Sequence, residues 1–305
     1  MLLRRRSDSA PALVALLALA LIGGCSSAPR APDDWATWKA TRMESVAGPE
    51  GWTTLIGLVW LKEGTQSAGA APTNDAVLPS TRAAAFVGNF TRNGDAVRFD
   101  AAPGVAATVD GLPVRSVVLE SDRDSNPTRL VLGPLTLVVI ARGDRLGLRI
   151  RDPDSPARLH FGGLRQFPYD SRWRLQGRFE PFHEPRVLKV PSIIGGTQDY
   201  VSPGAVVFSH RGREFRLDVA LEPGELDYFI MFRDTTSGTS TYPSGRFLYV
   251  APADASGRVT LDFNRAYTPP CGFTSFATCP LPPPQNHLPL EIRAGERSPA
   301  GHPGG

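Results

Sequence analysis

Short apolar stretches, separated by glycine, proline, asparagine and aspartate, dominate the chain beyond residue 50. This alternation is typical of antiparallel strands joined by tight turns. Asn93-Gly94 before residues 97–99, and residues 142–145 between two apolar runs, predict hairpins. The pattern predicts an all-β fold, an antiparallel sandwich or partly open barrel built from two β-modules. Strands are expected at 97–99, 135–140, 146–150, 206–208, 215–219, 226–232, 246–250 and 259–263.

One segment near the N-terminus has helical periodicity instead. Two aspartates at 33 and 34 precede apolar residues spaced by three or four positions, and Gly48-Pro49 follows them. Acidic residues at the start and a Gly-Pro stop predict one short amphipathic helix. Its apolar face, expected to pack on the β-domain, consists of Trp35, Trp38, Met43 and Val46.

The first residues have the layout of a secretory signal. Arg4 to Arg6 precede an apolar run at 10–22, and small residues lead to Cys25. The run is too short to cross a membrane as a helix, and the residues before Cys25 fit a lipidation motif. The alternative is an ordinary signal peptide with a chance cysteine. We expect a lipid on Cys25 to hold the protein to a membrane, and Ser26 favours the outer membrane, facing the periplasm.

The predicted domain organisation follows from these signals and from a polar stretch at 122–127. The pattern before that stretch resembles a forkhead-associated β-sandwich in shape, but the Arg and Ser that bind phosphothreonine cannot be placed, so no function is carried over. The expected segments are a signal peptide (1–24), a lipidated tether (25–32), a helix with a small β-module (33–125), a C-terminal β-domain with a Pro-rich arm (126–297) and a disordered tail (298–305).

Charge and motif content exclude several function classes. Without the signal peptide the chain has 30 basic and 29 acidic residues, which gives no argument for nucleic-acid binding. There is no phosphate-binding loop, dinucleotide fingerprint or nucleophile elbow. No cofactor and no metal are predicted; the partners expected are the membrane, through the lipid, and a small polar ligand or an envelope protein.

A cluster of hydroxyls, one carboxylate and one arginine follows the strand at 226–232. It is either a polar turn or a ligand site on a loop held by rigid strands. In the second interpretation Asp234 accepts hydrogen bonds from the ligand and Arg246 holds a carboxylate or phosphate. The candidate contacts, which include residues of the C-terminal segment, are Arg142, Asp234, Thr236, Thr241, Tyr242, Arg246, Asn264, Arg265, Asn286 and Glu296.

Cys271 and Cys279 are the only thiols besides Cys25. In an oxidising compartment a disulfide is the default expectation, and closing so short a loop stabilises by about 2–3 kcal/mol. Two buried reduced thiols are the first alternative. The second is a metal site with His287, or a Cys–His nucleophile, for which the irregular spacing is a weak signal.

A set of motifs spans nearly the whole chain after the tether. They are 261–267, Pro269-Pro270-Cys271, 277–283 and 294–296, together with Gly51-Trp52, 57–61, Arg142-Gly143 with Arg149, and 234–238 with Thr241-Tyr242. These motifs resemble domain-of-unknown-function family 1684 of bacteria. Departures are Thr268, where the pattern more often has Asn, and His287, where Arg is more usual. The resemblance implies no reaction.

Three functional hypotheses follow. The first is a lipid-anchored envelope protein that binds a small polar or anionic ligand, or an envelope partner. The second is an envelope hydrolase in which Asp234 or Glu296 is the general base and Arg246 steadies developing negative charge. The third is a purely structural module whose motifs serve as turn chemistry.

Overall fold

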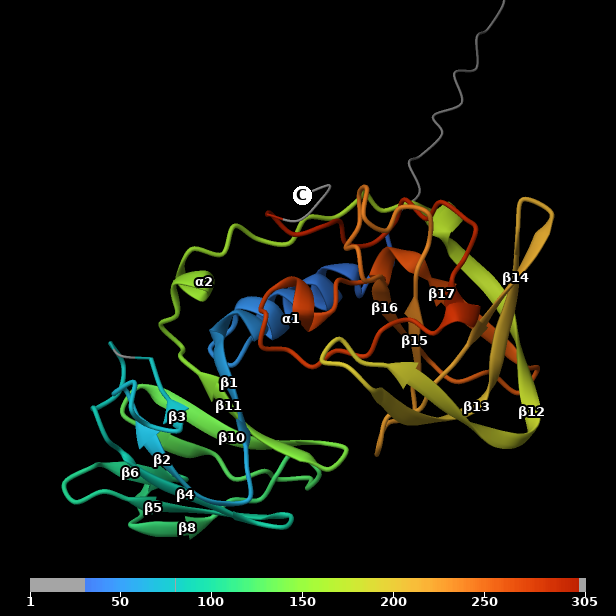
Figure 1. Ribbon diagram of the computed structural model, residues 1–305. Helices are drawn as coiled ribbons and strands as arrows, with labels where there is room; N and C mark the ends of the chain where they lie inside the picture. Colours follow the sequence, from blue (N-terminus) through green and yellow to red (C-terminus); the bar gives the residue numbers. More distant parts are fainter. Residues whose placement is uncertain (1–30, 80, 302–305) are drawn as a thin grey trace, which may run out of the picture.

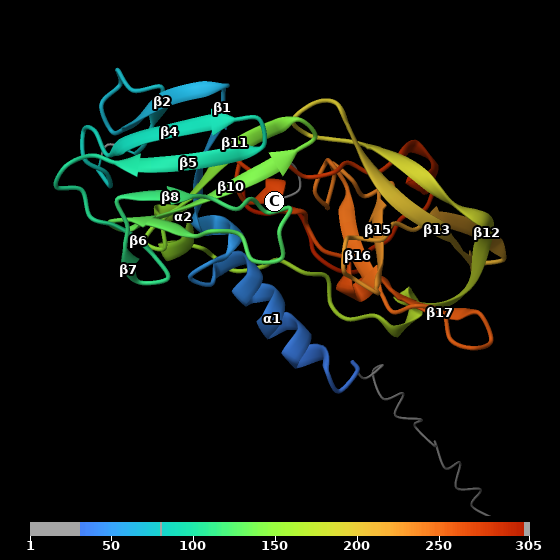
Figure 2. The same ribbon diagram turned by 90° about the horizontal axis from the view of Figure 1, so that it is seen from below.

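The computed structural model describes residues 31–79 and 81–301, which form two β-modules with helix α1 (Trp35–Ala47) between them (Figures 1 and 2). The all-β prediction is confirmed. The signal peptide, Cys25 and most of the tether lie outside the described residues. In the described part, no helix has the length and apolarity needed to span a membrane.

The N-terminal module is a sandwich of two sheets, one ordered β1-β11-β10-β9-β6-β7 and the other β3-β2-β4-β5-β8. A short 3-10 helix, η1 (Trp52–Thr54), leads into it from α1. The strands are β1 (Leu55–Leu61), β2 (Gly64–Gly69), β3 (Ala76–Val77), β4 (Gly88–Asn93), β5 (Ala96–Ala101), β6 (Ala107–Val109), β7 (Leu112–Pro113), β8 (Ser116–Val118), β9 (Leu130–Leu132), β10 (Leu135–Arg142) and β11 (Arg145–Arg151).

Side chains along β10 and β11 point alternately into the core of this sandwich and onto its outer face. Leu137, Leu148 and Ile150 are buried between the sheets. Because successive side chains of a strand point to opposite faces, Arg149 and Arg151 extend from the other face of the same sheet. That face is turned toward α1 and the C-terminal module (Figure 1).

The polar stretch at 122–127 is a turn and not a domain boundary. Strands β9 to β11, which follow it, pair within the N-terminal sandwich. The N-terminal module therefore extends to residue 151, beyond the predicted limit of 125. The shift has a physical reason: Leu130, Leu137 and Leu148 fill the same core as Phe90 and Phe99.

The C-terminal module is a sheet ordered β14-β13-β12-β17 that curves around a two-stranded sheet, β15-β16. Its longest pairing joins strands β12 and β13, whose register shifts between Pro181 and Arg186. The strands are β12 (Arg174–Pro191), β13 (Thr197–His210), β14 (Arg213–Asp218), β15 (Tyr228–Phe232), β16 (Arg246–Val250) and β17 (Arg258–Asp262).

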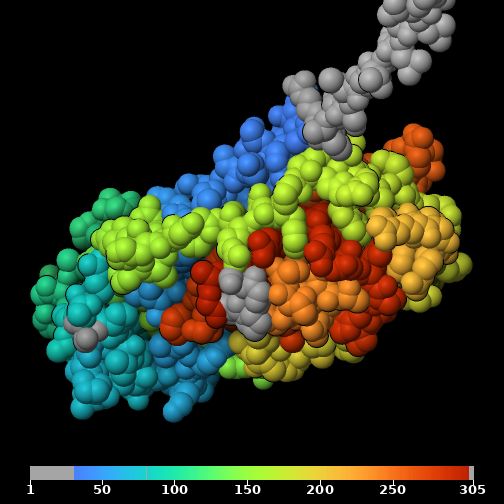
Figure 3. Space-filling model, turned by 90° about the horizontal axis from the view of Figure 1, so that it is seen from above, coloured from blue at the N-terminus to red at the C-terminus, as the bar shows by residue number. Residues whose placement is uncertain are grey.

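Two irregular segments join the modules, the linker 152–173 and the C-terminal arm 263–297. The linker, coloured yellow-green, crosses one face of the molecule beside the red arm in Figure 3, and Phe167 N–H donates to the Gly295 carbonyl. The prolines of the arm restrict its backbone and remove hydrogen-bond donors, and 263–297 contains no strand. Their short helices are α2 (Pro156–Leu159) and η2 (Ser171–Trp173) in the linker, and η3 (Phe263–Arg265), η4 (Pro270–Gly272) and η5 (Pro284–Asn286) in the arm.

The predicted disordered tail is ordered at its start. Ser298 is fully buried, and its N–H donates to the Ser240 carbonyl at 3.1 Å. This bond extends the contact of the arm with the loop after β15. Residues 302–305 lie outside the described part.

Candidate ligand cleft

A cleft of about 1570 Å³ lies between the two modules. It is bounded by α1, the β10–β11 hairpin, the β12–β13 ribbon, the β15–β16 sheet and residues 277–280 of the arm. Pockets at module interfaces, lined by aromatic side chains and a few placed charges, are where proteins commonly bind small molecules.

Arg149 is the unusual charge in this cleft. Its guanidinium lies 5.4 Å from the centre of the Trp52 ring, and its Nε is buried without a hydrogen-bond partner. It forms no ion pair with any carboxylate of the described residues. Burial first, and then the charges of Arg142 and Arg151, lower the pKa of Arg149 to about 10. The group therefore stays charged at neutral pH, with its charge uncompensated.

Arg142 stands beside it and is anchored. Its Nη1 contacts the Asp122 carboxylate at 2.8 Å, and its Nε donates to Thr278 Oγ1 at 2.9 Å. Arg142 and Asp122 neutralise each other. This end of the cleft thus carries one net positive charge, that of Arg149.

Aromatic rings also line the cleft. Tyr249 stacks on Phe229 at 5.0 Å and on Tyr267 at 6.2 Å between ring centroids. Burial raises the pKa of Tyr200 to about 12 and also raises the pKa of Tyr249, whose hydroxyl donates to the Glu222 carboxylate. The rings supply a planar surface with protonated hydroxyls.

Helix α1 closes one side of the cleft through Arg42. The Arg42 Nε lies 2.7 Å from Glu296 Oε1, and its Nη2 donates to the Thr268 carbonyl at 2.7 Å. The guanidinium also lies over the Tyr267 ring at 4.5 Å. Glu296, a predicted ligand contact, thus holds α1 on the arm. The second carboxylate oxygen of Glu296 accepts a hydrogen bond from Thr268 N–H.

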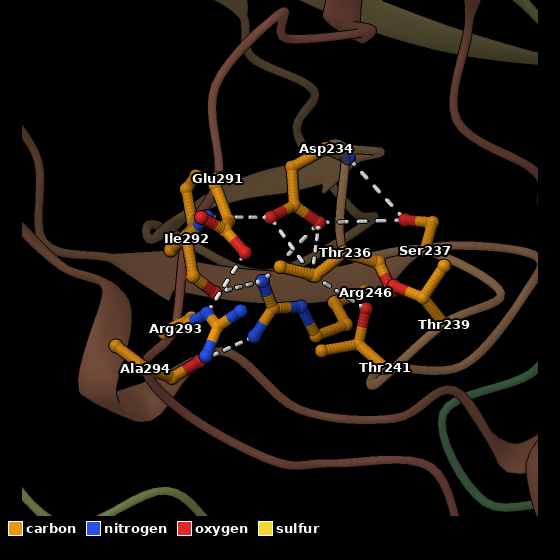
Figure 4. A network of polar contacts seen from close by, with 10 residues as sticks. All are labelled: Asp234, Thr236, Ser237, Thr239, Thr241, Arg246, Glu291, Ile292, Arg293 and Ala294. Carbon is orange, nitrogen blue, oxygen red and sulfur yellow. Dashed lines mark hydrogen bonds and ion pairs between the residues drawn. The ribbon is translucent and has the colours of Figure 1, made fainter. Parts of the chain in front are cut away.

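The loop after β15 is a buried network and not an open pocket (Figure 4). Asp234 accepts from Thr236 Oγ1 and from Ile292 N–H, both at 2.8 Å. Arg246 is fully buried, lies 3.4 Å from Asp234, and donates to the carbonyls of Ile292 and Ala294. Thr236 and Thr241 share a hydrogen bond of 2.9 Å. The cluster pins the arm to β15 and β16.

The remaining predicted contacts have similar bonds inside the fold. Asn264 bonds Asp170 and Asp262, and Asn286 bonds Asp218 and the Met231 carbonyl. Tyr242 donates to the Cys271 carbonyl, and Arg265 pairs with Asp34. Of the ten predicted contacts, only Arg142 lines the cleft. Asp234 and Glu296, proposed bases of a hydrolase, both have their oxygens occupied.

The structure contains no Cys271–Cys279 disulfide: both thiols are free. Cys271 N–H donates to Cys279 Sγ at 3.1 Å, so the sulfur accepts a hydrogen bond in this arrangement. The side chains are close enough to hydrogen-bond to each other. Their contact is nonetheless longer than a covalent sulfur–sulfur bond of about 2.05 Å. No group of three or more His, Cys, Asp or Glu that could hold a metal ion occurs in the described part of the chain.

Several lining residues were not singled out from the sequence as site residues. Arg149 was recognisable in the sequence as a cation within an apolar strand. Its two neighbours, Leu148 and Ile150, are in the core. Trp52 belonged to a motif of the family resemblance, which assigned it no role. Tyr200 and Tyr249 carried no signal, because they come from separate segments that only the folded chain brings together.

Comparison with known proteins supports the sequence resemblance. Residues 159–297 match the family described as "Protein of unknown function (DUF1684)", which confirms the resemblance over the C-terminal module and most of the linker. No curated protein matches the chain.

Three solved structures are similar to parts of the chain. An uncharacterised protein of Haloarcula marismortui is 29% identical, covers 48% of this chain and 81% of its own, and has a TM-score of 0.41. An FHA domain studied for phosphothreonine-dependent interactions is 16% identical, covers 31% of this chain and 92% of its own, and has a TM-score of 0.22. The FHA domain of FhaA, solved with the intracellular domain of Rv3910, is also 16% identical. It covers 31% of this chain and 97% of its own, with a TM-score of 0.22. These TM-scores are too low to support an argument.

Proposed function

We propose that this protein binds a small anionic ligand with an apolar or aromatic body in the cleft between its modules. The observation that carries the proposal is Arg149, a charged guanidinium without a carboxylate partner in the described residues. Arg149 is partly buried, with its Nε fully enclosed, and removing part of an uncompensated charge from water is costly. A ligand carboxylate, sulfonate or phosphate would compensate it with bidentate hydrogen bonds.

The arrangement around Arg149 supports this role. Arg142 is held by Asp122 and Thr278, so it contributes a second guanidinium in a fixed position. The stacked rings of Tyr249 and Tyr267 supply the surface for the ligand body. Pre-organised cations and aromatic rings lower the conformational entropy lost on binding.

We also propose that the protein works at the cell envelope, held by lipid on Cys25. The support is the sequence alone, through the arginines, the apolar run and the small residues before Cys25. The intact mass of the protein purified from membranes would include acyl chains on Cys25, and a mass equal to the bare processed chain contradicts the anchor.

The ligand site is tested with two matched fluorescent probes. Anilinonaphthalene sulfonate is an aromatic monoanion, and phenyl-naphthylamine is its neutral counterpart. We expect Arg149→Met to weaken binding of the sulfonate by at least about tenfold, because a hydrogen-bonded ionic contact is lost. Binding of the neutral probe changes little.

Arg145→Met is the control variant. Arg145 belongs to the same strand and the same face, but it stacks on Trp60 at 3.7 Å and does not line the cleft. Its substitution leaves the affinity for the sulfonate unchanged. Equal sulfonate binding by the Arg149→Met and Arg145→Met variants would refute the proposed site.

A further inference from the structure

Cys271 and Cys279 form an isolated thiol pair at the edge of the cleft. Both are free and nearly buried, with 9% and 4% of their surface exposed. The Cys271 N–H donates to Cys279 Sγ at 3.1 Å, and the Tyr242 hydroxyl donates to the Cys271 carbonyl at 2.9 Å. The Cys271 backbone is therefore fixed on both sides, through its N–H to the Cys279 sulfur and through its carbonyl to Tyr242, which keeps the two cysteines adjacent.

The second thiol belongs to a wall of the cleft. Ala277 to Pro280 line it. Thr278 Oγ1 accepts from Arg142 Nε at 2.9 Å, and the Cys279 carbonyl accepts from Ile193 N–H at 3.0 Å. A displacement of Cys279 is therefore passed through its neighbour Thr278 to Arg142, one of the two cations at the anion end.

The two thiols differ in their readiness to react. The hydrogen bond with Cys279 lowers the pKa of Cys271, and burial opposes this effect. The same thiol–thiol bond, with burial, raises the pKa of Cys279. The thiolate is the nucleophile in disulfide exchange, and Cys271 is also the more exposed of the two thiols, at 9% against 4%. We therefore assign Cys271 as the attacking group.

We propose that Cys271 and Cys279 are a redox-active pair that closes reversibly to a disulfide by exchange with a small-molecule disulfide, and that closure weakens anion binding in the cleft. Closure requires the sulfurs to approach to about 2.05 Å. This draws Cys279 toward Cys271 and takes Thr278 away from Arg142. The effect on binding rests on the proposed function, whereas disulfide formation does not.

The exchange balances in two steps. The Cys271 thiolate attacks one sulfur of the external disulfide, whose sulfur–sulfur bond breaks and releases one thiolate. Cys279 then loses its proton and attacks the Cys271 sulfur of the mixed disulfide, which releases the second thiolate. The pair is oxidised by two electrons, and the co-reactant, with the two thiol protons, becomes two thiols.

Disulfide formation is tested on the full-length protein in buffers of reduced and oxidised glutathione, followed by alkylation. One tryptic peptide, 266–293, carries both cysteines and separates them from Cys25. We expect two alkyl groups after reduction, none after oxidation, and a mass lower by two hydrogens than that of the dithiol peptide. Two alkyl groups after oxidation, or a stable glutathione adduct on one cysteine, overturns the proposal.

The effect on the cleft is measured by titrating anilinonaphthalene sulfonate into both redox states. We expect the oxidised protein to bind at least about threefold more weakly, and dithiothreitol to restore the affinity. The Cys271→Ser variant, and independently Cys279→Ser, should not respond to the oxidant. Equal affinity in both states overturns the coupling. Absence of sulfonate binding in both states contradicts the proposed function instead, whatever the peptide analysis finds.

Discussion

Arginine side chains have two different roles in this molecule. Arg246 and Arg42 are buried beside carboxylates and backbone carbonyls that satisfy most of their donors. Arg149 has no such partner in the described chain. A buried charge that the protein itself satisfies is structural, whereas one left unsatisfied costs stability and is typical of functional sites.

The Asp234–Arg246 pair gives the first prediction. Asp234→Ala leaves the fully buried Arg246 without its carboxylate, so the free energy of unfolding should fall by about 3–5 kcal/mol in urea titrations. Glu291→Ala is the control, because Glu291 pairs only with Arg293, on the surface, and its loss should matter little. Sulfonate binding by the folded Asp234→Ala protein should be unchanged; a selective loss of binding would favour the original ligand role of Asp234.

The sequence showed these residues but could not assign their roles. The Asp234 loop contains hydroxyls, a carboxylate and an arginine, which suit a ligand site and a buried network equally well. The difference depends on Ile292 and Ala294, which are far along the chain and supply backbone groups that no side-chain pattern reveals.

At the scale of elements, the turn before β16 depends on one glycine. Gly245 has φ +96°, and a Cβ there would lie 2.5 Å from the Phe232 carbonyl oxygen. Gly238, in the same loop, has φ +85° with open space around it. Gly238→Ala should therefore lose only about 1–2 kcal/mol of unfolding free energy through backbone strain, and Gly245→Ala distinctly more. Equal losses, measured by urea unfolding, would mean that packing at Gly245 does not matter.

Helix α1 is anchored at Arg42 by contacts with residues more than 200 positions away, Glu296 and Thr268. Glu296→Gln removes the charge that pairs with Arg42, so the unfolding free energy should fall by about 1–3 kcal/mol. Amide hydrogen exchange across 35–47 should become faster. Lys39→Met, on the exposed side of α1, should leave exchange unchanged. Unaltered protection of α1 in Glu296→Gln would contradict the anchoring role of this ion pair.

The elements themselves were largely predictable. Asn93-Gly94 and the Arg142–Arg145 turn specify hairpins because glycine at these turns adopts positive φ, at +60° and +63°. The buried position of Arg42 in α1 was not predictable, because an arginine on an amphipathic helix normally faces water and its partner Glu296 is distant in sequence.

At the scale of the whole molecule, the cleft exists only because two modules are held together by the linker and the arm. Its walls come from α1, β10–β11, β12–β13, β15–β16 and residues 277–280. The sequence predicted most strands of each module. The cleft between the modules forms from segments far apart in the chain, and no sequence pattern predicts that they pack together. The predicted single site on one polar loop therefore lies away from the cleft.

The most direct test of the central claim, that Arg149 is an uncompensated cation kept for a ligand, is the unfolding free energy of Arg149→Met in buffer without aromatic or multivalent anions. The lowered pKa of Arg149 means that folding disfavours its charged form, so at neutral pH this charge costs stability. The account predicts that Arg149→Met is more stable than the natural protein by about 1–3 kcal/mol. A loss of stability, like that expected for Asp234→Ala, would show that Arg149 is a structural residue and would contradict the account.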